Sequence, residues 1–252
     1  MASESAKRVE LRFEVPIWSP HWTLHDNAPR KPQNPLQVAI CDLLKLILSA
    51  WCRRRHADAL VSGNVALRWA PLHPKVGVNP DVYLVEPTPP LGPKSKSVRT
   101  WVEGHSPPRV AVEVVSDATS DIDYNVKPAK YAASKTRELW IFDPLMVGPK
   151  GGDAVRLQVW RREARRGFRR VYAGDGPARS EELGAWLVVT DGGERLRIAD
   201  HEDGAGLWLT GEEEARTREE EARAAELSER AAKDAALAEV ERLRGELAKL
   251  TR

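Results

Sequence analysis

The sequence predicts a mixed α/β protein whose core runs helix, three strands, helix and strand, with added β-hairpins and a charged C-terminal helix. Apolar residues recur at helical spacing after Asn34-Pro35, and short valine-rich and aromatic runs bounded by Gly, Pro and Asn then indicate strands. From Glu212 onward the composition changes to Glu, Arg and Ala. We therefore divide the 252 residues into an N-terminal arm (1–33), a main domain (34–210) and a charged helix or coiled coil (211–252).

The first helix begins at Asn34-Pro35, because Asn is a favourable N-cap and Pro suits the first helical position. Its apolar stretch is interrupted by Asp42 and Lys45, so we expect a core helix and no membrane span. No signal peptide opens the chain, and its two cysteines, both in this helix, suit a reducing compartment. We therefore expect a cytoplasmic protein.

The remaining core elements follow from turn residues and apolar runs. A short helix is expected over 126–135, with Asn125 as its N-cap and Pro128 in its first turn. Core strands are predicted at 65–69, 82–85, 110–115 and 139–142, a hairpin at 154–160 and 168–172, and further strands within 183–198.

An acidic residue interrupts the most apolar of these strands. Glu113 lies among valines and alanine in 110–115, and a carboxylate buried there must become neutral, pair with a cation or bind a metal. Asp81 opens the strand at 82–85, and consecutive strands are usually neighbours. Two carboxylates that converge in this way would suit Mg²⁺ or Mn²⁺ rather than zinc. Lys127, 14 residues after Glu113, is the candidate cation beside them.

Several motifs accompany these acids. They are Pro80-Asp81-Val82, the run 112–116, the four-residue spacing of Asp123, Lys127 and Tyr131, the run 138–144, and the late run 206–210. Together with the order of elements, they resemble the PD-(D/E)xK nuclease superfamily and, more closely, the bacterial Uma-two family of restriction-endonuclease-like proteins. The resemblance covers about residues 65–210 well and the arm poorly.

The resemblance implies a restriction-endonuclease-like core and a metal-dependent endonuclease acting on DNA. Asp81 and Glu113 would then hold Mg²⁺ (or Mn²⁺), and the carbonyl of Val114 would add a ligand. The superfamily pattern places a lysine two residues after the second acid, where this chain has Val115, so Lys127 on the following helix would take that role. Lys130 is the second choice. Asp123 and Tyr131 would support the site, and a polar side chain from the arm could complete it.

A different class of function fits the same features. The chain could be a catalytically inactive nuclease-like protein that binds DNA or acts as a scaffold through its C-terminal helix. Residues 212–252 contain 12 acidic and 9 basic residues, which leaves 25 acidic and 30 basic residues in the body. A mildly basic body is compatible with a DNA partner but does not require one.

The C-terminal segment has two sequence patterns. Opposite charges four residues apart, as at Glu214 and Arg218, support a helix in water. The apolar residues Ala236, Val240, Leu243, Leu247 and Leu250 are separated by 4, 3, 4 and 3 positions, which is the spacing of a coiled-coil seam. We expect a solvated helix over 212–235 and a possible homo-oligomer through 236–250.

Overall fold

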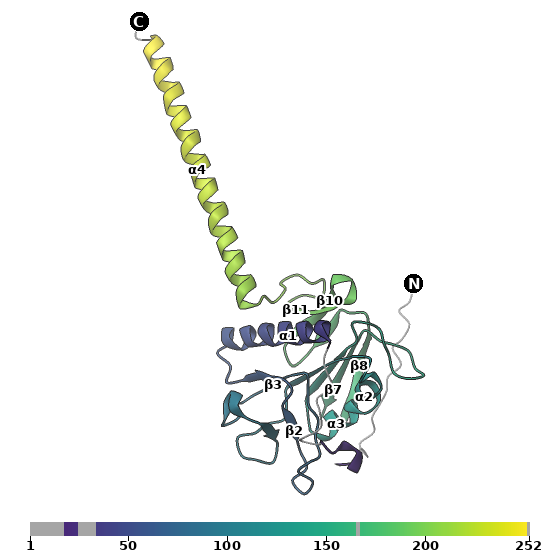
Figure 1. Ribbon diagram of the computed structural model, residues 1–252. Coiled ribbons are helices and arrows are strands. Elements are labelled where there is room, and N and C mark those ends of the chain that lie inside the picture. Colours follow the sequence, from purple (N-terminus) through teal and green to yellow (C-terminus); the bar gives the residue numbers. More distant parts are fainter. Residues whose placement is uncertain (1–17, 25–33, 165–166, 251–252) are drawn as a thin grey trace. The chain divides into compact units, whose positions relative to one another are not determined.

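The computed structural model describes residues 18–24, 34–164 and 167–250, so most of the predicted arm (1–17 and 25–33) lies outside the described residues. The chain separates into two compact units, Met1–Trp208 and Leu209–Arg252. The first unit contains a mixed α/β fold with a multi-stranded sheet (Figure 1), so the mixed α/β part of the prediction is confirmed.

The main sheet has six strands in the order β1-β3-β5-β6-β7-β8. Neighbours β5 and β6 are parallel, and every other neighbouring pair in this sheet is antiparallel. Its strands are β1 (Leu60–Ser62), β3 (Val82–Val85), β5 (Val110–Val114), β6 (Glu138–Phe142), β7 (Leu157–Glu163) and β8 (Gly167–Gly174). The last two form the hairpin expected from the sequence.

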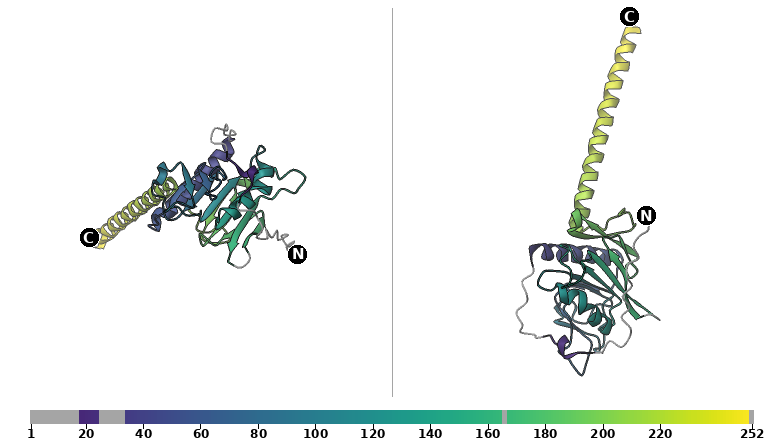
Figure 2. Two further views of the ribbon diagram at one scale, coloured as in Figure 1. Left: turned by 90° about the horizontal axis from the view of Figure 1, so that it is seen from below. Right: turned by 90° about the vertical axis from the view of Figure 1, so that its right-hand side faces the viewer.

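Helices cover both faces of this sheet, as the views in Figures 1 and 2 show. Helix α1 (Pro35–Arg54) packs on one face, where it meets the even-numbered valines of β5. Helices α2 (Ser120–Asn125) and α3 (Lys127–Ala133) lie on the other face, with Ala111 and Val115. Because side chains alternate along a strand, Glu113 is directed toward this second face.

Two smaller sheets complete the first unit. The three-stranded sheet is formed by β9 (Ala178–Ser180), β10 (Ala185–Thr190) and β11 (Arg195–Ala199), and it shares the core under α1. The two-stranded sheet pairs β2 (Ala66–Arg68) with β4 (Ser97–Arg99) in parallel. Short 3-10 helices span Pro20–Trp22, Gly92–Lys94 and Asp191–Gly193.

The first core strand differs from the prediction. The strand predicted at 65–69 corresponds to β2, which lies outside the main sheet, and β1 occupies the place beside β3. The chain leaves the main sheet at Gly63, where an added Cβ would lie 2.1 Å from the Asp81 carbonyl oxygen, and at Asn64, whose φ is +57°. The turn residues before the predicted strand therefore end a core strand, β1, instead of introducing one.

The second predicted helix is also different. Residues 120–133 form two short helices that meet at Val126, and Asn125 ends α2 instead of capping α3. The Asn125 side chain donates to Asp121 Oδ1 at 2.9 Å. Pro128 lacks a backbone N–H, which explains why regular α-helical bonding is interrupted at this point.

Helix α1 has the cap predicted for it. The Asn34 side chain accepts a hydrogen bond from the Gln37 backbone N–H at 2.7 Å. Among the described helices, α1 is the one that is long and apolar enough to cross a membrane, but half of its apolar window is buried within the fold. Asp42 and Lys45 form an ion pair at 2.7 Å, which marks its polar side. This pattern is typical of a core helix.

The second unit consists mainly of α4 (Gly211–Leu250), a continuous helix of 40 residues. Thr210 Oγ1 accepts from the Glu213 N–H at 3.1 Å, and Glu213 Oε2 accepts from the Thr210 N–H at 2.8 Å. This reciprocal capping box fixes the start of the helix.

Candidate active site

Glu113 lies at the centre of the candidate site and is completely buried. Its Oε1 accepts a hydrogen bond from the Tyr131 hydroxyl at 2.5 Å, and its Oε2 lies 2.5 Å from Lys127 Nζ. Burial raises the pKa of Glu113, against the lowering effect of Lys127, and nearby Asp81 and Asp123 also raise it. Glu113 therefore depends on partners on α3 to hold a negative charge in the sheet.

Asp81 lies beside Glu113 through the strand register. Strands β3 and β5 pair Val82 with Val112, and Asp81 and Glu113 are the residues next to this pair, close enough for the charge of Asp81 to raise the pKa of Glu113. Asp81 Oδ2 also accepts from the Val114 backbone N–H at 2.9 Å. The structure thus brings the two predicted acids together.

Lys127 connects Glu113 with a third carboxylate. Its Nζ lies 2.6 Å from Asp123 Oδ1, and Asp123 Oδ2 accepts from the Thr119 hydroxyl at 2.7 Å. Burial opposes the charge on Lys127, but Glu113, Asp123 and Asp81 outweigh it and raise the lysine pKa. The ammonium group is therefore protonated at neutral pH, and 15% of the side chain remains exposed.

Lys130 and Tyr131 have different surroundings, although both are buried. Lys130 Nζ donates to the Gly77 carbonyl oxygen at 3.3 Å, and burial and then Lys127 lower its pKa to about 8. The lysine in contact with the acids is therefore Lys127 and not Lys130. Tyr131 packs in the core, and its hydroxyl also reaches Glu113.

Gln37 is a polar neighbour of Asp81 and Val114 that was not predicted from the sequence. It lies in the first turn of α1, and its Nε2 donates to the Val114 carbonyl oxygen at 2.9 Å and approaches Asp81 Oδ2 at 3.4 Å. We expected such a group from the arm; in the described part of the chain it comes from α1. The sequence feature that could have identified Gln37 is an uncharged polar residue on the buried side of an apolar helix.

The donor set of this site fits a small divalent ion. Asp81 and Glu113 supply carboxylate oxygens, and the Val114 carbonyl keeps a second lone pair besides the one that Gln37 uses. Across residues 18–24, 34–164 and 167–250, no three His, Cys, Asp or Glu side chains are grouped so that they could hold a metal. Mg²⁺ needs no such group, because one or two carboxylates usually bind it and waters complete its coordination.

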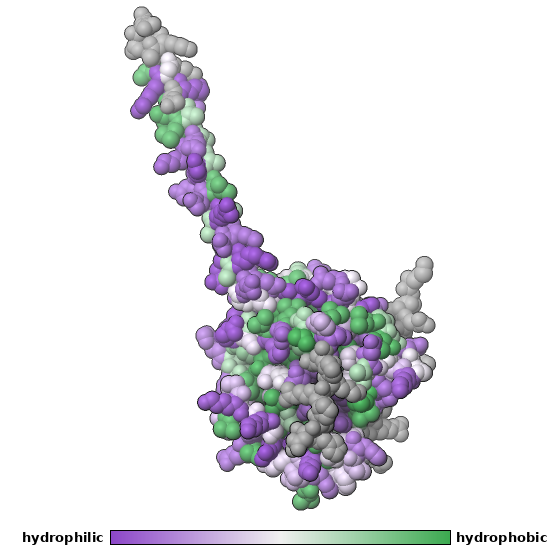
Figure 3. Space-filling model, in the orientation of Figure 1, coloured by the Kyte–Doolittle hydropathy of each residue, from purple (hydrophilic) through white to green (hydrophobic). Residues whose placement is uncertain are grey.

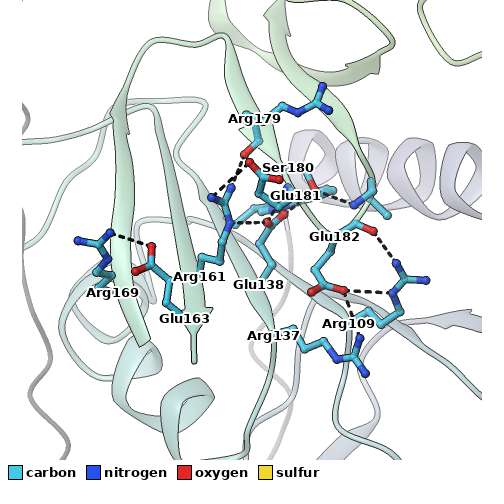
Figure 4. A network of polar contacts seen from close by, with 12 residues as sticks. Arg109, Arg137, Glu138, Arg161, Glu163, Arg169, Arg179, Ser180, Glu181 and Glu182 are labelled. Atoms are coloured by element: carbon cyan, nitrogen blue, oxygen red, sulfur yellow. Dashed lines mark hydrogen bonds and ion pairs between the residues drawn. The ribbon is translucent and has the colours of Figure 1, made fainter. Parts of the chain in front are cut away.

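A second buried acid, Glu138, has the surroundings of a structural carboxylate, with all of its partners inside the protein (Figure 4). Its Oε1 accepts from Trp140 Nε1 and the Ser180 hydroxyl, and its Oε2 accepts from the Glu181 N–H and from Arg161. Four donors occupy the two oxygens, so little capacity remains for a ligand.

Arginines on strands β7 and β8 are likewise engaged within the protein. Arg161 pairs with Glu138, and Arg162 donates to the carbonyl oxygens of Ala132 and Thr136. Arg169 pairs with Glu163 at 2.7 Å, as Figure 4 shows. These contacts favour a structural role for these arginines over binding of the DNA backbone.

The chain is similar to known proteins over most of its main domain. A model of the Uma2 family, described as "Putative restriction endonuclease", matches residues 19–189. A solved structure from Anabaena variabilis, described as a "putative nuclease belonging to DUF820", has a TM-score of 0.41 and 12% sequence identity. It covers 60% of this chain and 75% of its own. No curated protein matches the sequence.

Proposed function

Because this chain belongs to the Uma2 family of restriction-endonuclease-like proteins, we propose that it is a metal-dependent endonuclease that hydrolyses DNA phosphodiester bonds. The observation that supports this most directly is the buried Glu113 carboxylate, which pairs with Lys127 and lies near Asp81, the residue that precedes β3. A buried acid with a raised pKa beside a second acid and a lysine is a common feature of catalytic sites.

Asp81, Glu113 and the Val114 carbonyl oxygen would hold Mg²⁺ or Mn²⁺. When bound, such an ion lowers the pKa of a water ligand and offsets negative charge on a phosphate oxygen. The protein fixes its own donors in advance: the Val114 N–H orients Asp81, and the Gln37 amide holds the Val114 carbonyl. Both contacts keep the donor oxygens at one end of β5.

Lys127 would serve as the cation that orients the attacking water and stabilises the charge that develops on the phosphate. Its ammonium group already lies between two carboxylates, and part of its side chain is accessible. Tyr131 would act as a positioning residue, because its hydroxyl fixes one oxygen of Glu113. Asp123 would do the same for Lys127.

The alternative is a nuclease-like protein that binds DNA or acts as a scaffold without cutting. Val115 favours it, since this buried residue occupies the position at which the superfamily pattern has lysine. The long helix α4 also fits a scaffold.

Plasmid cleavage tests the proposal. Supercoiled DNA incubated with the purified protein and Mg²⁺ or Mn²⁺ should become nicked or linear, and EDTA should prevent this. Glu113→Ala should lower the rate on the order of 100-fold or more, because it removes a metal ligand. Glu103→Ala is the matched control, because it deletes an exposed acid.

Two outcomes would contradict the assigned site or function. Cleavage that survives Glu113→Ala, in a variant with an unchanged circular dichroism spectrum, would show that another site or a contaminant cuts. DNA binding by the wild type without cleavage under either metal would favour the non-catalytic alternative.

A further inference from the structure

The last third of α4 exposes an apolar stripe. Val240, Leu243 and Leu247 have exposed fractions of 44%, 50% and 66%. Figure 3 shows hydrophobic side chains interspersed among hydrophilic ones along this helix. The spacing from 236 to 250 defines a heptad repeat with positions labelled a to g. Val240 and Leu247 are at position a, and Leu243 is at position d.

We propose that this stripe, residues 236–250, pairs with the same stripe of a second copy in a parallel, in-register, two-stranded coiled coil. A β-branched residue at a with leucine at d favours two parallel strands, and Val240 and Leu243 follow that rule. Burial of the exposed leucines in the seam would supply the main driving force. This pairing requires neither a metal nor DNA and is independent of the proposed activity.

Charged residues beside the seam select the parallel orientation. Glu239 is at a g position and Arg244 at the e position five residues later. Parallel helices bring a g residue of one copy beside that e residue of the other, so Glu239 would meet Arg244 of the second copy. Antiparallel helices would instead bring g positions beside g positions, so the glutamates Glu239 and Glu246 of the two copies would face each other.

Glu239 is available for this exchange. In α4 it pairs with Arg242 at 2.6 Å, and the side chains are 53% and 55% exposed. Exposed pairs of this kind contribute little to stability, so a change of partner costs little. Upstream, the equivalent seam positions are Lys233, Glu229 and Glu226, so the coil should end near residue 236.

Sedimentation equilibrium of the full chain tests the association. The wild type should be a dimer, and Leu243→Glu should be a monomer, because it places charge in the seam. Leu227→Glu is the matched control: Leu227 is an exposed leucine of α4 outside the 236–250 seam, and the dimer should persist. A monomeric wild type, or a trimer, would overturn the proposal.

Two cysteine variants test the orientation. Ala236→Cys and Leu247→Cys lie about 16 Å apart along the helix. A parallel in-register pair brings each position beside itself, so both variants should form disulfide-linked dimers under oxidation. An antiparallel pair can do this for at most one of them. The wild type controls for Cys41 and Cys52, which are both buried.

Charge exchange tests the contact between Glu239 and Arg244. Glu239→Arg should weaken the dimer on the order of tenfold at low salt, because two attractive pairs become repulsive. The double variant Glu239→Arg with Arg244→Glu should restore it. Equal weakening in the single and double variants would overturn the assigned pairing.

Discussion

Single residues determine whether the candidate site can hold a charge. Glu113 is enclosed by the sheet, and the groups that stabilise its carboxylate come from α3, where Lys127 and Tyr131 are one turn apart. Val115 follows β5, lies on the same face as Glu113 and packs in the core. The cation that contacts Glu113 is therefore supplied by α3. A lysine on the helix can therefore contact the acid that the strand supplies.

Lys130 provides a pH-dependent test at this scale. Its pKa is about 8 in the folded protein and 10.5 in an ordinary setting. Between these values the unfolded chain binds the proton and the folded chain does not, so stability should rise with pH over this window and fall as pH drops through 8. Wild type should gain about 2 kcal/mol relative to Lys130→Met from pH 7.5 to pH 10.

Urea unfolding of both proteins at the two pH values measures this difference. Lys94→Met serves as the control, because Lys94 is exposed, and it should show no comparable change relative to the wild type. A Lys130→Met difference that is the same at both pH values would contradict the assigned environment of Lys130.

Elements differ in how far local sequence determines them. The cap of α1 could be predicted because Asn34 and Gln37 lie within one turn. The exit of the chain from the main sheet at Gly63 could not, because it depends on the approach of Asp81, 18 residues later. Glu113 within a strand and Asp81 just before one were predictable, whereas Gln37 was not, because its role arises from contact with β5, 77 residues away.

Gly245 offers a test of α4 as an element. It lies in the helix with open space around its Cα, so alanine there should add no clash. Alanine is favoured over glycine in a helix by about 1 kcal/mol. Gly245→Ala should therefore slow amide exchange near the C-terminal end of α4 about fivefold. Ala238→Gly, one heptad earlier, should have the opposite effect, and no change in either variant would contradict a helix that is stable by itself.

At the scale of the whole molecule, the two compact units suggest two separate roles, one for the candidate site and one for association. The first unit contains the acids, Lys127 and Gln37, and the second contains the exposed seam. If the seam pairs in parallel, both copies enter the coil from the same end, and two candidate sites can act on one DNA. A nuclease that must cut both strands benefits from this arrangement, whereas a single site makes one cut at a time.

The products of plasmid cleavage should therefore depend on the seam. Wild-type protein should convert supercoiled DNA to linear DNA with little nicked intermediate, because two sites are delivered together. Leu243→Glu should keep the rate of the first cut per site and accumulate nicked circles, since the residues assigned to the candidate site all belong to the first unit. The control Leu227→Glu should behave as wild type. Linear product formed equally by the Leu243→Glu monomer would show that cleavage of both strands does not require the coil, and loss of the first cut would show that α4 acts on the site itself.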